Sequence, residues 1–423
     1  MSTAVAMPDQ KKSYIVPLII IGAFFFIFGF TTWANSQLIP YFKIACELST
    51  SQSLLVATAF FAAYFVMAIP SSYILDKLGY KKGMILGLFV MAAGALLFIP
   101  AADARSYQLF LVALFVIGTG LALLQTASNP YVTILGPIDS AAQRISIMGI
   151  CNKLAGIVAV TIMGGIVLKN VDAFKAKLLT LAPAEKVSEL DTLVKRVVNP
   201  YITIAIILVA FGILLAFLNL PEVKQPEEAD NAHSSSKTSV LQFPFLILGA
   251  IAIFFYVGVE VMSYDTFAGF GESLGFSLEK ASGFAKFTGY GLLAGYVLGI
   301  LLIPKVISQR AALIFSVLLS MLLVVISIFM KGWMAVYCFA GLGFSNAIMW
   351  PAIWPLAING LGRFTRKGAA LLIMGIAGGA ILPPIYGKLA EALDSRQMAY
   401  WLMIPCYLYI LYFATIGYKA GKK

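Results

Sequence analysis

The chain has 423 residues, of which 61% are hydrophobic and 12% charged. A water-soluble domain cannot bury that much apolar surface, and uncharged runs of about 20 residues, the length that spans a bilayer, recur from end to end. The formal net charge of +11 does not indicate nucleic-acid binding, because the basic residues fall in short segments between apolar runs, where they orient a membrane protein. We therefore predict an all-α polytopic membrane protein whose partner is the lipid bilayer, with no nucleic acid.

Apolar runs separated by polar turns predict twelve transmembrane helices, at residues 15–42, 54–75, 83–100, 107–134, 144–168, 199–220, 241–269, 281–304, 311–330, 333–357, 367–389 and 396–418. An even number of crossings places both termini on one side. Basic residues are concentrated in the segments on that side, so both termini are expected in the cytoplasm and the protein in the cytoplasmic (inner) membrane. The loop at 169–198 is also basic, but its acidic residues balance part of that charge, so it counts less in the comparison of the two sides. We expect it to be a short amphipathic external segment.

The longest clearly polar segment is residues 221–240, PEVKQPEEADNAHSSSKTSV. It divides the chain into an N-terminal six-helix bundle at 1–220 and a C-terminal six-helix bundle at 241–423. This composition predicts a cytoplasmic linker between the two bundles.

The two halves carry a weak repeat in their first helices. FFIFGFTTWANS at 25–36 has the same spacing as FFYVGVEVMSYD at 254–265. The alignment pairs Gly29 with Gly258, Thr31 with Glu260, and Ser36 with Asp265. Parallel repeats of six helices, with a midplane site between them, describe the major facilitator architecture, so we expect two pseudo-symmetric bundles.

A second sign of that architecture is the turn after residue 75. Its sequence, Ser72-x-x-x-Asp76-Lys77-x-Gly79-Tyr80-Lys81-Lys82, resembles the major facilitator loop motif G-x-x-x-D-R-x-G-R-R. A carboxylate here can cap a helix N-terminus and pair with basic residues, which holds one conformer. The alternative is an ordinary basic turn with one acidic residue. The proposed conformational motif comprises Asp76, Lys77, Gly79, Lys81 and Lys82.

Tryptophans and an asparagine recur at spacings of four in the predicted helix 333–357. Asn346, Trp350 and Trp354 would share one helical face at that spacing. Two indoles and an amide suit a sugar, whose C–H face stacks on aromatic rings while its hydroxyls need amide partners. The alternative is a helix seam with interfacial tryptophans.

Two segments are similar to the fucose–galactose–glucose symporter family. The run QTASNPYV at 125–132 resembles that family's E-T/A-A-A-N-P-Y-V stretch, and MWPAIWPLAINGLGRFT with LLIMGIAGGAILPP resembles its helix 10–11 signature. The resemblance implies import of a monosaccharide with a co-transported cation, a proton or in some relatives sodium, and neither enzymatic activity nor a cofactor. The family's fucose symporter uses an Asp in helix 1 and a Glu in helix 4, where this chain has Ser36 and Gln125.

Ionisable residues lie elsewhere inside the predicted helices, at Lys153, Glu260 and Asp265. A charge within the bilayer costs several kcal/mol unless it is paired or hydrated, so each is a functional candidate. We assign cation coupling to Glu260, with Lys153 as a modulating charge and Asp265 in reserve. A structural Glu260–Lys153 ion pair and a solvated helix end at Asp265 are the alternatives.

Amide side chains provide the remaining candidates for binding sugar hydroxyls. Gln125 and Asn129 lie four residues apart on one helix, and Asn152 precedes Lys153. Asn35 and Gln37 point to different faces of the first helix, so only one of them is expected to reach the cavity. Interhelical hydrogen bonds are the alternative role for these amides.

The leading hypothesis is a secondary active hexose importer that works by alternating access, acts as a monomer and has no metal site. Glucose, galactose, an N-acetylhexosamine and fucose all fit the composition of the site. A sugar sensor of the same fold would usually carry a signalling domain. A drug or lipid exporter of the same superfamily predicts an apolar cavity, whereas Gln125, Asn129, Asn152 and Asn346 predict a polar one.

Overall fold

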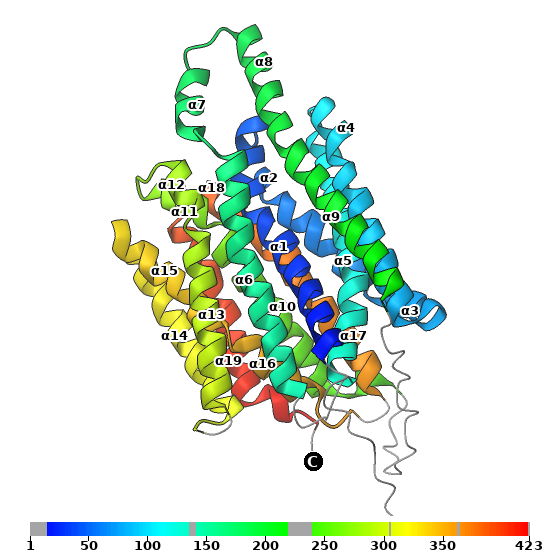
Figure 1. The fold of residues 1–423 in the computed structure, drawn as a ribbon. Coiled ribbons are helices and arrows are strands. Elements are labelled where there is room, and N and C mark those ends of the chain that lie inside the picture. The colour runs from blue at the N-terminus through cyan, green and yellow to red at the C-terminus, as the bar shows by residue number, and fades with distance from the viewer. Residues whose placement is uncertain (1–14, 135–140, 219–238, 304–305, 362–363, 422–423) are drawn as a thin grey trace, which may run out of the picture.

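The computed structural model describes residues 15–134, 141–218, 239–303, 306–361 and 364–421, and within these ranges all regular structure is helical. Figure 1 shows the long helices lying side by side along one direction. One end of the bundle carries α7 (Val171–Leu178) and α8 (Pro183–Val194), and the C-terminus lies at the other end. These ends are named the α8 side and the terminal side.

The other helices of the N-terminal half are α1 (Ile15–Ala45), α2 (Thr50–Ser53), α3 (Leu55–Leu96), α4 (Phe98–Asp103), α5 (Tyr107–Ile134), α6 (Ala141–Val167) and α9 (Val198–Phe217). Inside α3 the chain turns at Gly79, whose φ of 76° and ψ of 169° are accessible to glycine without the steric cost that a Cβ imposes. The two helices predicted at 54–75 and 83–100 are therefore joined by a one-residue break instead of a loop.

The C-terminal half consists of α10 (Pro244–Asp265), α11 (Phe267–Ser273), α12 (Leu278–Ser282), α13 (Ala285–Leu302), α14 (Gln309–Phe329), α15 (Gly332–Asn346), α16 (Met349–Ile358), α17 (Thr365–Met374), α18 (Gly378–Ala392) and α19 (Met403–Thr415). Short 3-10 turns join α17 to α18 and precede α19. The helix predicted at 333–357 is interrupted after Asn346, because the ring of Pro351 collides with the carbonyl four residues earlier and offers it no N–H.

Twelve membrane crossings account for these helices. The described residues contain 11 segments long and apolar enough to span a bilayer, and one of them, Thr50–Asp103 with 54 residues, includes both crossings that meet at Gly79. The helices predicted from the sequence are confirmed in number and type. Their ends differ by a few residues because helix ends fray and are set by local contacts.

The repeat between the halves is visible in their packing. α1 packs on α6 in the first half, and α10 packs on α18 in the second. A Cβ on Gly29 would overlap the backbone carbonyl of Asn152 in α6, and a Cβ on Gly258 would overlap Leu382 of α18. The two aligned glycines thus permit equivalent close helix crossings, as small residues do in membrane bundles.

The two halves meet along α6 with α13 and along α3 with α18, and α1 also contacts α10. In Figure 1, α3, α5 and α9 lie to the right, α13, α14 and α15 to the left, and α1, α6 and α10 between them. Side chains that lie between α1, α6 and α10 are therefore at the interface of the two halves.

Candidate functional site

One face of α10 carries Tyr256, Glu260 and Tyr264, which are spaced four residues apart and so align along the helix. Each meets a side chain from another helix: Tyr256 meets Trp350, Glu260 meets Lys153, and Tyr264 meets Trp33. This stripe and its partners form the central cluster, defined as Trp33, Asn152, Lys153, Tyr256, Glu260, Tyr264 and Trp350.

An ion pair at the middle of the cluster joins the two halves. Lys153 Nζ of α6 lies 2.9 Å from Glu260 Oε1 of α10, and the two side chains are only 8% and 9% exposed. Lys153 Nζ also lies 4.6 Å from the centroid of the Trp33 ring, a cation–π distance. Removing one partner of such a buried pair leaves an uncompensated charge, so each partner needs the other across the two halves.

Trp33 and Tyr264 form an aromatic stack next to the ion pair, with ring centroids 3.9 Å apart and an interplanar angle of 28°. Trp33 Nε1 donates to Asn152 Oδ1 at 3.4 Å, and Asn152 Nδ2 donates to the carbonyl of Phe25 at 3.3 Å. The Tyr264 hydroxyl is buried without a hydrogen-bond partner among the described residues. Ring faces beside an unsatisfied hydroxyl and an amide match the surface of a sugar.

The predicted tryptophan site is only partly assembled as expected. Trp350 and Trp354 stack with centroids 5.4 Å apart, and Trp350 lies 6.3 Å from the Tyr256 ring. Asn346 instead lies in the interior of the second half, where its Oδ1 accepts from the hydroxyls of Tyr407 at 3.0 Å and Ser320 at 3.3 Å. The helix break after Asn346 separates its contacts from those of the tryptophans.

The amides of the first half are divided between several environments. Gln125 Nε2 donates to the Tyr64 hydroxyl at 2.8 Å, an interhelical bond between α5 and α3. Asn35 is 1% exposed and lines a very small cavity between α1, α3, α5 and α9, whereas Gln37 Nε2 donates across the halves to the Ser282 carbonyl at 2.9 Å. Asn35 and Gln37 therefore do point to different faces. The side chain of Asn129 lies outside the described residues.

A cavity of about 430 Å³ opens on the α8 side, between the end of α1 and the elements that follow α10. Asp265, the last residue of α10, lines it and is 2% exposed. Residues of α1, α11 and α18 line the same cavity. The alternative of a solvated helix end stays a prediction, because the space beside Asp265 opens on the α8 side.

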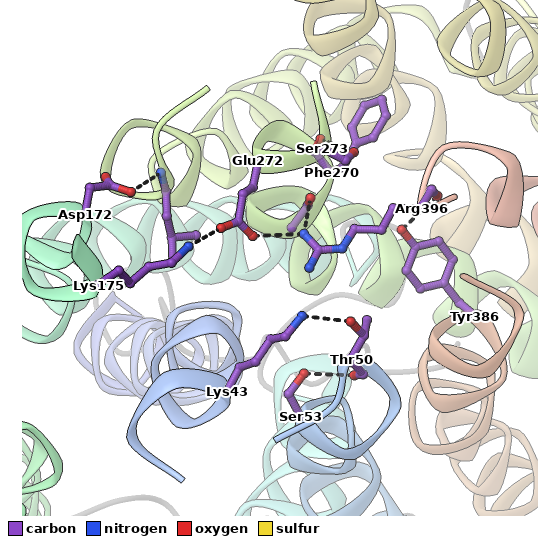
Figure 2. Close-up of polar contacts among 12 residues, drawn as sticks. Lys43, Thr50, Ser53, Asp172, Lys175, Phe270, Glu272, Ser273, Tyr386 and Arg396 are labelled. Carbon is purple, nitrogen blue, oxygen red and sulfur yellow. Dashed lines mark hydrogen bonds and ion pairs between the residues drawn. The ribbon is translucent and has the colours of Figure 1, made fainter. Parts of the chain in front are cut away.

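A polar network, named the α8-side clasp, joins the halves beside this cavity. Glu272 of α11 accepts from Lys175 of α7 at 2.5 Å and from Arg396 Nη1 at 3.1 Å, as Figure 2 shows. Both carboxylate oxygens of Asp172 accept backbone N–H groups at the start of α12, at 3.0 and 2.9 Å. Burial alone would raise the pKa of the Glu272 carboxyl, but its bonds to Lys175 and Arg396 hold that pKa below its ordinary value.

The model of the Major Facilitator Superfamily matches residues 19–383. The chain belongs to this superfamily. A glucose/galactose transporter of Brucella abortus (strain 9-941) is 36% identical, over 97% of this chain and 96% of the relative. The L-fucose-proton symporter of Escherichia coli (strain K12) is 30% identical, over 96% of this chain and 94% of the relative.

Solved structures agree with this assignment. The crystal structure of the Major Facilitator Superfamily transporter FucP in the outward conformation superposes with a TM-score of 0.73 at 29% identity, covering 96% of this chain and 99% of that one. The resemblance to fucose–galactose–glucose symporters inferred from QTASNPYV and the helix 10–11 segments is thereby confirmed.

The superfamily loop motif lies on the terminal side, around Gly79. Lys81 Nζ donates to the carbonyl of Ala216 at 2.9 Å, near the C-terminal end of α9. A cation is favourable there because it meets the negative end of the helix dipole. Lys77 and Lys82 are exposed. The motif of this superfamily member therefore ties the α3 turn to α9 within the first half.

Proposed function

We propose that the chain is a secondary active sugar transporter that imports a monosaccharide together with a cation by alternating access. The relatives named glucose/galactose transporter and L-fucose-proton symporter support this proposal. The observation that carries it is the buried Lys153–Glu260 pair, which spans the two halves beside aromatic ring faces.

The sugar binds at the central cluster in this proposal. Trp33, Trp350 and Trp354 supply ring faces for its C–H surface, and Asn152 with the Tyr264 hydroxyl supplies hydrogen-bonding groups. Gln125 extends the polar wall in the first half, and Asn129 stays a candidate from the sequence. A hexose such as glucose or galactose, or an N-acetylhexosamine, is the expected substrate class.

Coupling is assigned to Glu260 and Lys153. With Glu260 ionised, its attraction to Lys153 at 2.9 Å holds α10 against α6. Binding of a cation, a proton or sodium, to the Glu260 carboxylate cancels that attraction. Lys153 is then free to donate to sugar hydroxyls, so cation and sugar together determine when the halves separate. No prosthetic cofactor takes part.

Two rigid bundles, residues 1–220 and 241–423, rock about this site in the proposed cycle, joined by a cytoplasmic linker at 221–240. The bias of basic residues toward the terminal side supports a cytoplasmic position for that side in the inner membrane, with the α8 side facing outward. The α8-side clasp closes the outer face, and the motif of Asp76, Lys77, Gly79, Lys81 and Lys82 stabilises one access state from the cytoplasmic face. A single chain contains every part, so the transporter works as a monomer.

Substitution of Glu260 separates coupling from sugar movement. Glu260→Gln keeps the shape of the side chain but removes its charge change. In proteoliposomes it should abolish accumulation of sugar against its gradient while exchange of labelled for unlabelled sugar continues, because exchange needs no net cation movement. Glu185→Gln, at an exposed position of α8, is the matched control and should behave as wild type. Undiminished accumulation by Glu260→Gln would remove the coupling role from this residue.

A further inference from the structure

Two carboxylates of α10 lie in very different surroundings. Glu260 is paired with Lys153 at 2.9 Å. Asp265 is 2% exposed, none of the ion pairs in the described part of the chain includes it, and its Oδ2 has no hydrogen-bond partner there. Asp265 is also the carboxylate of the two that lines the cavity on the α8 side. It is thus buried yet adjacent to a space large enough for several water molecules.

Keeping such a side chain ionised has a high free-energy cost. Burying a carboxylate without a counter-ion or a full set of hydrogen bonds costs many times more free energy than burying the neutral acid. Ionisable groups left in this condition inside membrane helices are found on ion and proton pathways. Asp265 therefore needs a cation of its own whenever the cavity has the geometry described here.

The charged groups that face the cavity do not provide it. The titratable side chains lining the cavity with Asp265 are Lys43, Glu47, Lys175, Glu272, Tyr386 and Arg396. Lys175 and Arg396 share the Glu272 carboxylate, as Figure 2 shows. Lys43 donates to the Thr50 hydroxyl at 2.8 Å, and none of the ion pairs in the described part of the chain joins it to Asp265. Tyr386 donates to the carbonyl of Arg396 at 3.0 Å. On the far side, Tyr400 contacts the neighbouring Thr266.

We propose that Asp265 is the proton-loading site of the transporter, filled from the α8 side through this cavity. A hydronium ion in the cavity gives its proton to an Asp265 carboxylate oxygen, which leaves water and a neutral carboxylic acid. The proposed ligand is a proton, because a single carboxylate with an unpartnered oxygen can take up a proton without further ligands, whereas sodium needs several oxygen ligands at once. The proposal rests on the proposed cation symport and specifies its first step.

Transport by Asp265→Asn tests the functional half of this inference. In proteoliposomes with an inward proton gradient, this variant should bring labelled sugar only to the outside concentration, while exchange remains within about twofold of wild type. The control is Asp394→Asn, since Asp394 is exposed on the same side and its φ of 48° is a conformation that Asn accepts readily. Accumulation by Asp265→Asn equal to wild type, or accumulation driven by sodium alone, overturns the proposal.

Infrared difference spectroscopy tests the protonation itself without any transport. Spectra of purified protein recorded on either side of a pH step should contain a carboxylic-acid C=O band that shifts in D₂O. One component of that band should be missing in Asp265→Asn and retained in Glu260→Gln and Asp394→Asn. If Asp265→Asn loses no component of the band, Asp265 does not take up the proton, even if sugar symport itself is established. If wild type accumulates no sugar but Asp265→Asn changes the band as expected, the protonation site is supported and only the proposed symport fails.

Discussion

The buried ion pair of the central cluster leads to a quantitative prediction about stability. Lys153→Met leaves Glu260 charged and unpaired in a site where both side chains are less than a tenth exposed, and such a loss typically costs about 3–5 kcal/mol. Glu260→Gln should cost less. Its amide oxygen can still accept from Lys153, which also keeps its contact with Trp33 at 4.6 Å, worth about 0.5–2 kcal/mol. The double variant leaves no buried charge unpaired, so its loss of stability should be smaller than the sum of the losses in the two single variants.

The free energy of unfolding can be measured for all four proteins by titrating detergent micelles with a denaturing detergent and following fluorescence. We expect an interaction term of about 2–3 kcal/mol, within the range for contacting residues. The control is the same cycle on Lys177 and Glu189, which lie 2.7 Å apart but are 52% and 33% exposed; a surface pair should give about 1 kcal/mol at most. An interaction term for Lys153 and Glu260 that is no larger than the term for the surface pair would refute the reasoning.

Three further predictions concern the sugar wall, the loop motif and the clasp. Trp350→Ala should weaken binding of labelled sugar by about 1 kcal/mol or more, the size of an aromatic contact, and normal affinity in the folded variant would exclude a stacking role. Asp76→Asn should change the turnover rate more than the affinity of the binding-competent state, because the motif acts on a conformational equilibrium; unchanged transport and unchanged thiol accessibility on both sides would contradict it. Because the pKa of Glu272 is lowered in the folded state, its contribution to stability is complete above the ordinary glutamate pKa of about 4.3 and is lost as the pH falls through the lowered value. Thermal stability should therefore show an acid-dependent loss below about pH 4 that is reduced in Glu272→Gln, and identical pH profiles would contradict the clasp.

Much of the fold could be predicted, because it is determined by the lengths of the apolar runs and by the matching spacing of residues in the two halves. The alignment of Gly29 with Gly258 predicted a repeat, and the structure shows that both positions leave no room for a Cβ. The alignment could not give helix ends. The turn at Gly79 and the break before Pro351 depend on single residues. Asn346, which precedes that break, accepts hydrogen bonds from Tyr407 and Ser320.

The site was predicted in part. Glu260 and Lys153 were singled out by the cost of burying a charge, and the structure pairs them across the halves. This pair is the contact that the sequence left open as an alternative to a coupling role. The stripe of Tyr256 and Tyr264 around Glu260 was missed, although its spacing of four is visible in the sequence. The α8-side clasp could not be predicted, because the contact of Lys175 with Glu272 joins residues 97 positions apart, and no local pattern specifies that pairing.

Uptake by the wild-type protein tests the central claim most directly. Proteoliposomes would be given labelled glucose, galactose, N-acetylglucosamine or fucose, with an inward proton gradient or an inward sodium gradient imposed separately. We expect at least one of these sugars to accumulate above its outside concentration with the proton gradient and only to equilibrate with the sodium gradient. Equilibration of every sugar under both gradients would contradict cation-coupled import, and accumulation driven by sodium alone would contradict proton loading at Asp265.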